Sequence, residues 1–130
     1  MSKEQEKNIA YQALLEEWLD GQEKPCPEIL LAVKKCSPTF STEMIHKILL
    51  RCNGISEDPE RWGTWSLLAE SICKNCPQPF TEDVWALLDE MQNRAQYLFD
   101  HHTSTNLYFH EWTYRVVAAI QARKHLEHKE

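Results

Sequence analysis

Glycine is scarce in this sequence, which has only three in 130 residues. A phosphate-binding loop needs several glycines, because backbone N–H groups must approach the phosphate closely. The sequence also contains no GxSxG nucleophile motif. Because these motifs are missing, the sequence gives no support for a nucleotide-binding enzyme or a serine hydrolase. We expect neither a catalytic residue nor a cofactor.

Long apolar runs are missing as well. No run approaches the roughly 20 residues that span a bilayer, and the opening residues are charged. The cysteines form an odd set of five, which favours reduced thiols over a disulfide framework. We therefore expect a cytoplasmic protein with no membrane partner. The cysteines are Cys26, Cys36, Cys52, Cys73 and Cys76.

Apolar residues recur at three- and four-residue spacing along nearly the whole chain, and six prolines fall between these patterns. This arrangement predicts one all-α domain over residues 1–130. The expected helices cover residues 2–20, 25–36, 41–53, 59–75, 81–100 and 104–126.

Two helix ends are predicted from local chemistry. Asn53 and Gly54 both tolerate the left-handed conformation that often follows a helix, so the third helix should stop there. The tail from Arg123 to Glu130 alternates in charge sign, and we expect it to fray.

A small helical unit occurs twice between Pro25 and Leu88. Leu30 and Leu67 occupy equivalent positions 37 residues apart, and Phe40 and Phe80 follow them 40 residues apart. That period suits stacked helical hairpins, here over residues 26–53 and 59–100. The pattern resembles the HEAT-type α-solenoid, in which such repeats stack and terminal helices act as caps. A compact, irregular six-helix bundle is the alternative.

The net charge of −6 is distributed unevenly. Residues 24–53 carry five basic and two acidic side chains, whereas residues 54–100 carry nine acidic and three basic ones. The two segments could pair between subunits of a homo-oligomer. A nucleic-acid-associated protein is an alternative function, although direct binding to phosphates needs a basic surplus on one face. The candidate phosphate contacts are Lys34, Lys35, Lys47 and Arg51.

Cys73 and Cys76 form the one CxxC motif, and with His101 and His102 they could supply four zinc ligands. The 25 residues between Cys76 and His101 are an unusual spacing, and adjacent histidines are poorly placed for joint ligation. The competing interpretation puts Cys73 in the core and Cys76 in a turn. A small zinc-binding protein is thus a further alternative.

Aromatic residues give the most informative signal, because five tryptophans are several-fold more than usual for this length. Trp62, Trp65 and Trp112 fit core-facing stripes. Other aromatics share helix faces with polar residues, which indicates an exposed patch that could anchor a partner. These are Trp85, Tyr97, Phe99, Tyr108 and Tyr114.

The function that these observations favour is a non-enzymatic protein–protein interaction module of the adaptor, chaperone, immunity-protein or inhibitor type. The aromatic patch supplies affinity, and an acidic surface steers a basic partner, for example a nucleic-acid-processing protein. The acidic residues expected to take part are Glu57, Asp58, Glu60, Glu82, Asp83, Asp89 and Glu90.

Overall fold

The computed structural model describes residues 2–55, 62–101 and 109–128, and these residues confirm the all-helical prediction. One short 3-10 turn, η1, lies between the second and third helices. The elements are α1 (Lys3–Leu19), α2 (Cys26–Cys36), η1 (Ser37–Thr39), α3 (Thr42–Ile55), α4 (Trp62–Asn75), α5 (Glu82–His101) and α6 (Phe109–Glu127).

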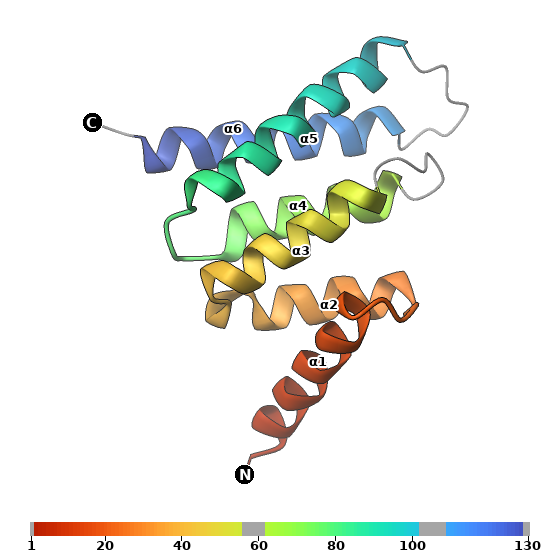
Figure 1. Ribbon diagram of the computed structural model, residues 1–130, viewed down its shortest axis with the longest axis vertical. Coiled ribbons are helices and arrows are strands. Elements are labelled where there is room, and N and C mark those ends of the chain that lie inside the picture. Colours follow the sequence, from red (N-terminus) through yellow and green to blue (C-terminus); the bar gives the residue numbers. More distant parts are fainter. Residues whose placement is uncertain (1, 56–61, 102–108, 129–130) are drawn as a thin grey trace.

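The helices stack in order from the N-terminal end of the molecule to the C-terminal end (Figure 1). They pack as three pairs, α1 with α2, α3 with α4 and α5 with α6. In addition, α2, α4 and α6 pack side by side as one layer, while α5 packs on α3 in the other. The α4 helix lies at the centre, because it contacts α2, α3 and α6.

This pairing differs by one helix from the predicted hairpins over residues 26–53 and 59–100. The proline-containing turns after α2 and α4 carry the chain from one layer to the next pair, instead of folding each helix back on its predecessor. The described helices nevertheless pack compactly, as expected for a helical bundle.

Hydroxyl side chains cap the N-termini of α1, α3 and α5. Ser2 and Gln5 form a reciprocal capping box at α1, with bonds of 3.2 and 3.0 Å. Ser41 and Thr81 each accept a hydrogen bond from the backbone amide three residues later. Gly21, with φ +103°, follows the end of α1 and adopts a conformation that favours glycine.

The predicted helix stop at Asn53 and Gly54 and the predicted fraying from Arg123 were wrong. Gly54 lies inside α3, which continues to Ile55. Arg123 and Glu127 belong to α6, and Arg123 is buried with 7% of its surface exposed. At Arg123, tertiary contacts outweigh the local signal.

Arg123 joins the C-terminal half of α6 to the connection between α4 and α5. Its guanidinium donates to the backbone carbonyls of Cys73 at 3.3 Å, of Cys76, and of Gln78 at 2.6 Å. Its Nε donates to Glu127 at 2.5 Å. A residue predicted to lie in a frayed tail therefore satisfies the carbonyls at the end of α4.

Arg123 and Glu127 also hold the segment before α5 that contains Phe80. Glu127 also accepts a hydrogen bond of 2.9 Å from the backbone amide of Phe80. The Arg123 guanidinium lies over the Phe80 ring, 4.0 Å from its centroid.

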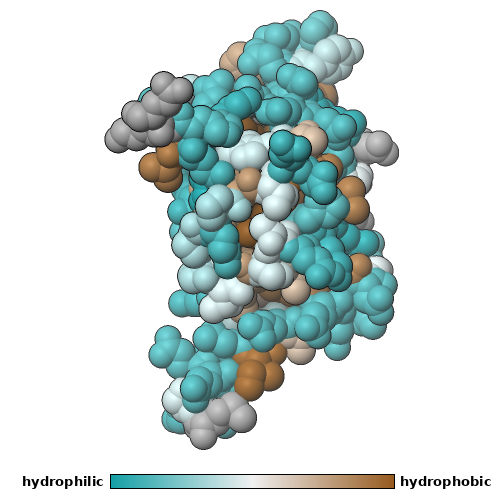
Figure 2. Space-filling view, turned by 60° about the vertical axis from the view of Figure 1, so that its left-hand side comes forward, coloured by the Kyte–Doolittle hydropathy of each residue, from teal (hydrophilic) through white to brown (hydrophobic). Residues whose placement is uncertain are grey.

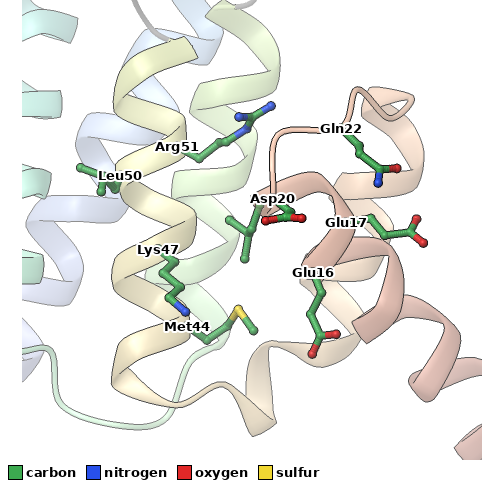
Figure 3. Close-up of a pocket in the computed structure, with 9 residues that line it drawn as sticks. Glu16, Glu17, Asp20, Gln22, Met44, Lys47, Leu50 and Arg51 are labelled. Atoms are coloured by element: carbon green, nitrogen blue, oxygen red, sulfur yellow. The ribbon is translucent and has the colours of Figure 1, made fainter.

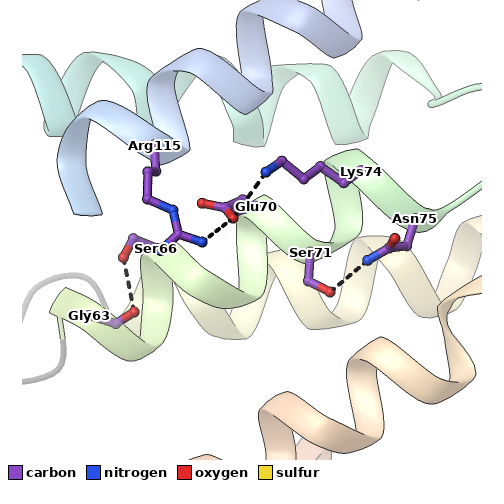
Figure 4. A network of polar contacts seen from close by, with 7 residues as sticks. All are labelled: Gly63, Ser66, Glu70, Ser71, Lys74, Asn75 and Arg115. Atoms are coloured by element: carbon purple, nitrogen blue, oxygen red, sulfur yellow. Dashed lines mark hydrogen bonds and ion pairs between the residues drawn. The ribbon is translucent and has the colours of Figure 1, made fainter. Parts of the chain in front are cut away.

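The buried carboxylate of Glu70 also fastens α6 to α4 (Figure 4). Glu70 on α4 is 6% exposed and pairs with Arg115 of α6 at 2.7 Å and with Lys74 at 3.3 Å. Close by, Gly63 faces the ring of Trp112, and a Cβ atom added there would lie 2.8 Å from that ring. Glycine at this position lets the two helices approach closely.

Candidate partner-binding surface

The α5 helix presents one buried and one exposed face. Asp83, Glu90 and Tyr97 follow one another at intervals of seven residues, so they lie on one side of the helix, and all three are exposed. We call these three residues the α5 stripe. The core-facing residues of the same helix are Val84, Leu87, Leu88, Met91 and Ala95.

Exposed aromatic side chains lie on the last turns of α5 and on the first turns of α6. Tyr97 is 61% exposed and stacks on His101, with ring centroids 4.2 Å apart. Phe99 meets His110 of α6 edge-on at 5.0 Å. Tyr114, 73% exposed, lies one turn after His110 on the same side of α6. We call Tyr97, Phe99 and Tyr114 the junction aromatics.

The structure separates Trp85 from the junction aromatics. Trp85 is half-buried in the first turn of α5, where its ring lies 5.4 Å from that of Phe80 and 5.6 Å from that of His128. It precedes Tyr97 by 12 residues, which is about 18 Å along a helix. The remaining predicted aromatic residue, Tyr108, lies outside the described residues.

Four of the predicted acidic residues lie in the part of the chain that the structure describes, and all four are exposed on α5. Glu82 and Asp83 occupy its first turn, where their negative charges interact favourably with the helix dipole. Asp89 pairs with Lys124 at 3.4 Å, and Glu90 accepts a hydrogen bond of 3.0 Å from Asn53 of α3. Glu57, Asp58 and Glu60 lie outside the described residues.

The four basic residues of the nucleic-acid alternative are divided between two helices. Lys34 and Lys35 lie exposed in the last turn of α2. Lys47 and Arg51 lie on α3 and line a groove that also contains acidic residues of α1. Lys47 is further paired with Glu43 at 3.1 Å. The groove lining therefore mixes both charge signs.

The proposed zinc ligands that the structure describes, Cys73, Cys76 and His101, are not brought together. Cys76 precedes α5, whereas His101 is the last residue of that 20-residue helix, a separation of about 30 Å. The described part of the chain contains no cluster of three or more potential metal ligands. His102 lies outside the described residues. Cys73 and Cys76 are instead buried beside Arg123.

The thiols should differ sharply in reactivity, because Cys26 is exposed and the other four are buried. Burial raises the pKa of Cys52 and Cys73 to about 12 and that of Cys76 to about 11, so these thiols stay protonated near neutral pH. We expect a thiol reagent at pH 8 to label one cysteine rapidly in the native protein and all five in denaturant. Rapid labelling of Cys73 and Cys76 in the native state would contradict their placement.

The same burial predicts a loss of stability at alkaline pH. In the unfolded chain these thiols ionise near their ordinary pKa of about 8.5, whereas the folded protein keeps them protonated. Stability from this source is therefore complete below about pH 8.5 and falls as the pH rises towards the folded-state pKa values. Urea denaturation at pH 7, 9 and 10 measures the decline, and Cys52→Ala should reduce it.

The face of the molecule in Figure 2 is mostly hydrophilic, and its hydrophobic residues appear as separate spots. Scattered exposed apolar residues are usual for a folded protein, so they do not by themselves indicate a binding site. The junction aromatics lie at the same end of the α5–α6 pair, where Phe99 meets His110, while Tyr97, two residues before Phe99, faces another side of α5.

Comparisons with protein families, with curated proteins and with solved structures found no match to this chain. Within the described residues, no helix is long and apolar enough to cross a membrane.

Proposed function

We propose that this chain is a non-enzymatic, cytoplasmic protein-binding module that contacts a basic protein partner through α5 and the start of α6. The observation that carries this proposal is the high exposure of Tyr97 and Tyr114, 61% and 73%, at the junction of these helices. Tyrosine anchors protein interfaces well, since it buries a large ring while keeping a polar tip for hydrogen bonding.

Charge supports a basic partner. The α5 stripe places Asp83 and Glu90 on the same side of the helix as Tyr97. A partner that packs on Tyr97 therefore meets carboxylates along the preceding four turns of α5. Such charges mainly raise the rate of association and favour partners of opposite sign. Raising the salt concentration should accordingly slow association more than it speeds dissociation.

The test compares two double variants of the purified chain against a partner recovered from its native extract. Tyr97→Ala/Tyr114→Ala removes the two most exposed rings of the junction. Truncating two interface anchors should weaken binding by about 30-fold or more. Leu31→Ala/Ile9→Ala is the matched control, because these side chains are also large, apolar and exposed, but lie on α2 and α1.

The control variant should bind like the unaltered chain. Equal binding by both double variants, each folded by circular dichroism, would exclude the junction aromatics as the contact surface. A partner whose association rate is insensitive to salt would contradict the steering role of the α5 stripe.

A further inference from the structure

A groove of about 770 Å³ lies between the end of α1 and the outer side of α3, away from the junction aromatics (Figure 3). Its two walls carry opposite charges. Glu16 of α1 and Asp20, which directly follows α1, line one wall, whereas Lys47 and Arg51 line the other from α3. Leu19 and Met44 supply apolar surface between them, and Leu50, 53% exposed, lines the outer edge on the far side of α3.

The charges of the two walls do not neutralise each other. Glu16 and Asp20 form no ion pair with any other described residue, and the third acid, Glu17, pairs with Lys24 at 2.6 Å. Lys47 pairs with Glu43 of its own helix. Carboxylates and cations thus face a common opening without bridging it.

Arg51 is held in place on the α3 wall of the groove. Its guanidinium lies over the ring of Trp18, 5.4 Å from the centroid, which holds it at the groove wall. Its Nε atom is buried, and within the described residues it has no hydrogen-bond acceptor. A carboxylate that enters the groove can pair with the exposed part of this guanidinium, and such charge-assisted hydrogen bonds are stronger than neutral ones.

From this arrangement we propose that the α1–α3 groove binds a short peptide segment of a partner protein in which an apolar residue is flanked by one basic and one acidic residue. The acidic residue pairs with Lys47 and Arg51, and the basic residue pairs with Glu16 and Asp20. The apolar residue packs on Leu19 and Met44. A groove of this volume has room for about three extended residues.

The proposal concerns a different surface from the junction aromatics, so each can fail alone. Its test uses three blocked pentapeptides as probes, Ac-GKLEG-NH2, Ac-GKLKG-NH2 and Ac-GELEG-NH2, titrated into the full chain labelled with ¹⁵N. The mixed-charge peptide should bind several-fold more tightly than either single-sign peptide, and amide shifts should centre on residues 16–22 and 44–51. Equal binding of the three peptides, or shifts confined to other helices, would overturn the proposal.

Charge reversal at exposed groove positions sharpens the test without disturbing the core. Lys47→Glu should weaken binding of the mixed-charge peptide about fivefold. This variant should then prefer the all-basic peptide. Glu16→Lys should instead prefer the all-acidic peptide. Lys34→Glu changes the net charge as much as Lys47→Glu but lies outside the groove, and should leave the affinity unchanged.

A second copy of the chain is the competing occupant. It would appear as a concentration-dependent increase in molecular mass without peptide that Lys47→Glu abolishes. That result would overturn the peptide proposal, whereas a mass independent of concentration, together with selective binding of the mixed peptide, would support it.

Discussion

Replacing Arg123 with methionine is expected to lower the free energy of unfolding by about 3–5 kcal/mol. The substitution leaves the Glu127 carboxylate buried without its partner and frees the backbone carbonyls of Cys73, Cys76 and Gln78. Urea denaturation followed by circular dichroism measures the loss. The large effect is expected because the side chain of Glu127 is itself only 13% exposed.

The matched control is Lys124→Met, one residue further along α6. Lys124 makes a surface ion pair with Asp89, and its side chain is half exposed, so we expect a change within about 0.5 kcal/mol. Adding Glu127→Met to Arg123→Met should recover part of the stability, because no buried charge is then left unpaired. Equal stabilities of Arg123→Met and Lys124→Met would show that the cluster does not fasten α6.

Leu68→Ala should cost about 2–5 kcal/mol, again by urea denaturation. Leu68 is completely buried on α4, the helix that packs against α2, α3 and α6. With rigid helices on three sides, the cavity left by the truncation has little freedom to collapse, which places the cost towards the upper part of this range.

Leu31→Ala is the matched substitution on the surface. Leu31 lies on α2 and is 43% exposed, so the same chemical change should cost less than about 1 kcal/mol. If the two leucine variants were equally stable, α4 could not be the central helix of a packed stack.

Helix positions could be predicted from the sequence because their signals are local. The hydroxyl caps at Ser41 and Thr81, the glycine at position 21 and the apolar spacing each act within a few residues. The pairing of helices could not be predicted in the same way. It depends on the direction in which each proline turn sends the chain, and that direction is set by contacts between distant segments.

The contacts of Arg123 could not be predicted from the sequence for the same reason. It continues the apolar stripe of α6 formed by Val116, Ala119 and Ile120, and a lone cation in such a stripe is a usable signal for a buried partner. Its partners, however, are backbone carbonyls some 45 to 50 residues away. Charge alternation in the tail therefore favoured a solvent-exposed interpretation.

The candidate surface was predictable in part. Periodicity indicated exposed aromatics on α5 and α6, and Tyr97 and Tyr114 are indeed exposed. It did not reveal that Trp85 packs on Phe80 and His128, since that contact requires the end of α6 to return to the start of α5. The histidines beside Tyr97 and Phe99 were also missed, although the four-residue spacing of Tyr97 and His101 is a recognisable helical pair.

The central claim is that a protein partner covers the α5–α6 junction. Hydrogen exchange, measured by mass spectrometry on the chain with and without its recovered partner, tests this directly because it locates protection along the sequence. The account predicts slower exchange in residues 89–101 and 109–118, with α2 unchanged. Protection confined to α1, α2 and α3 would contradict it.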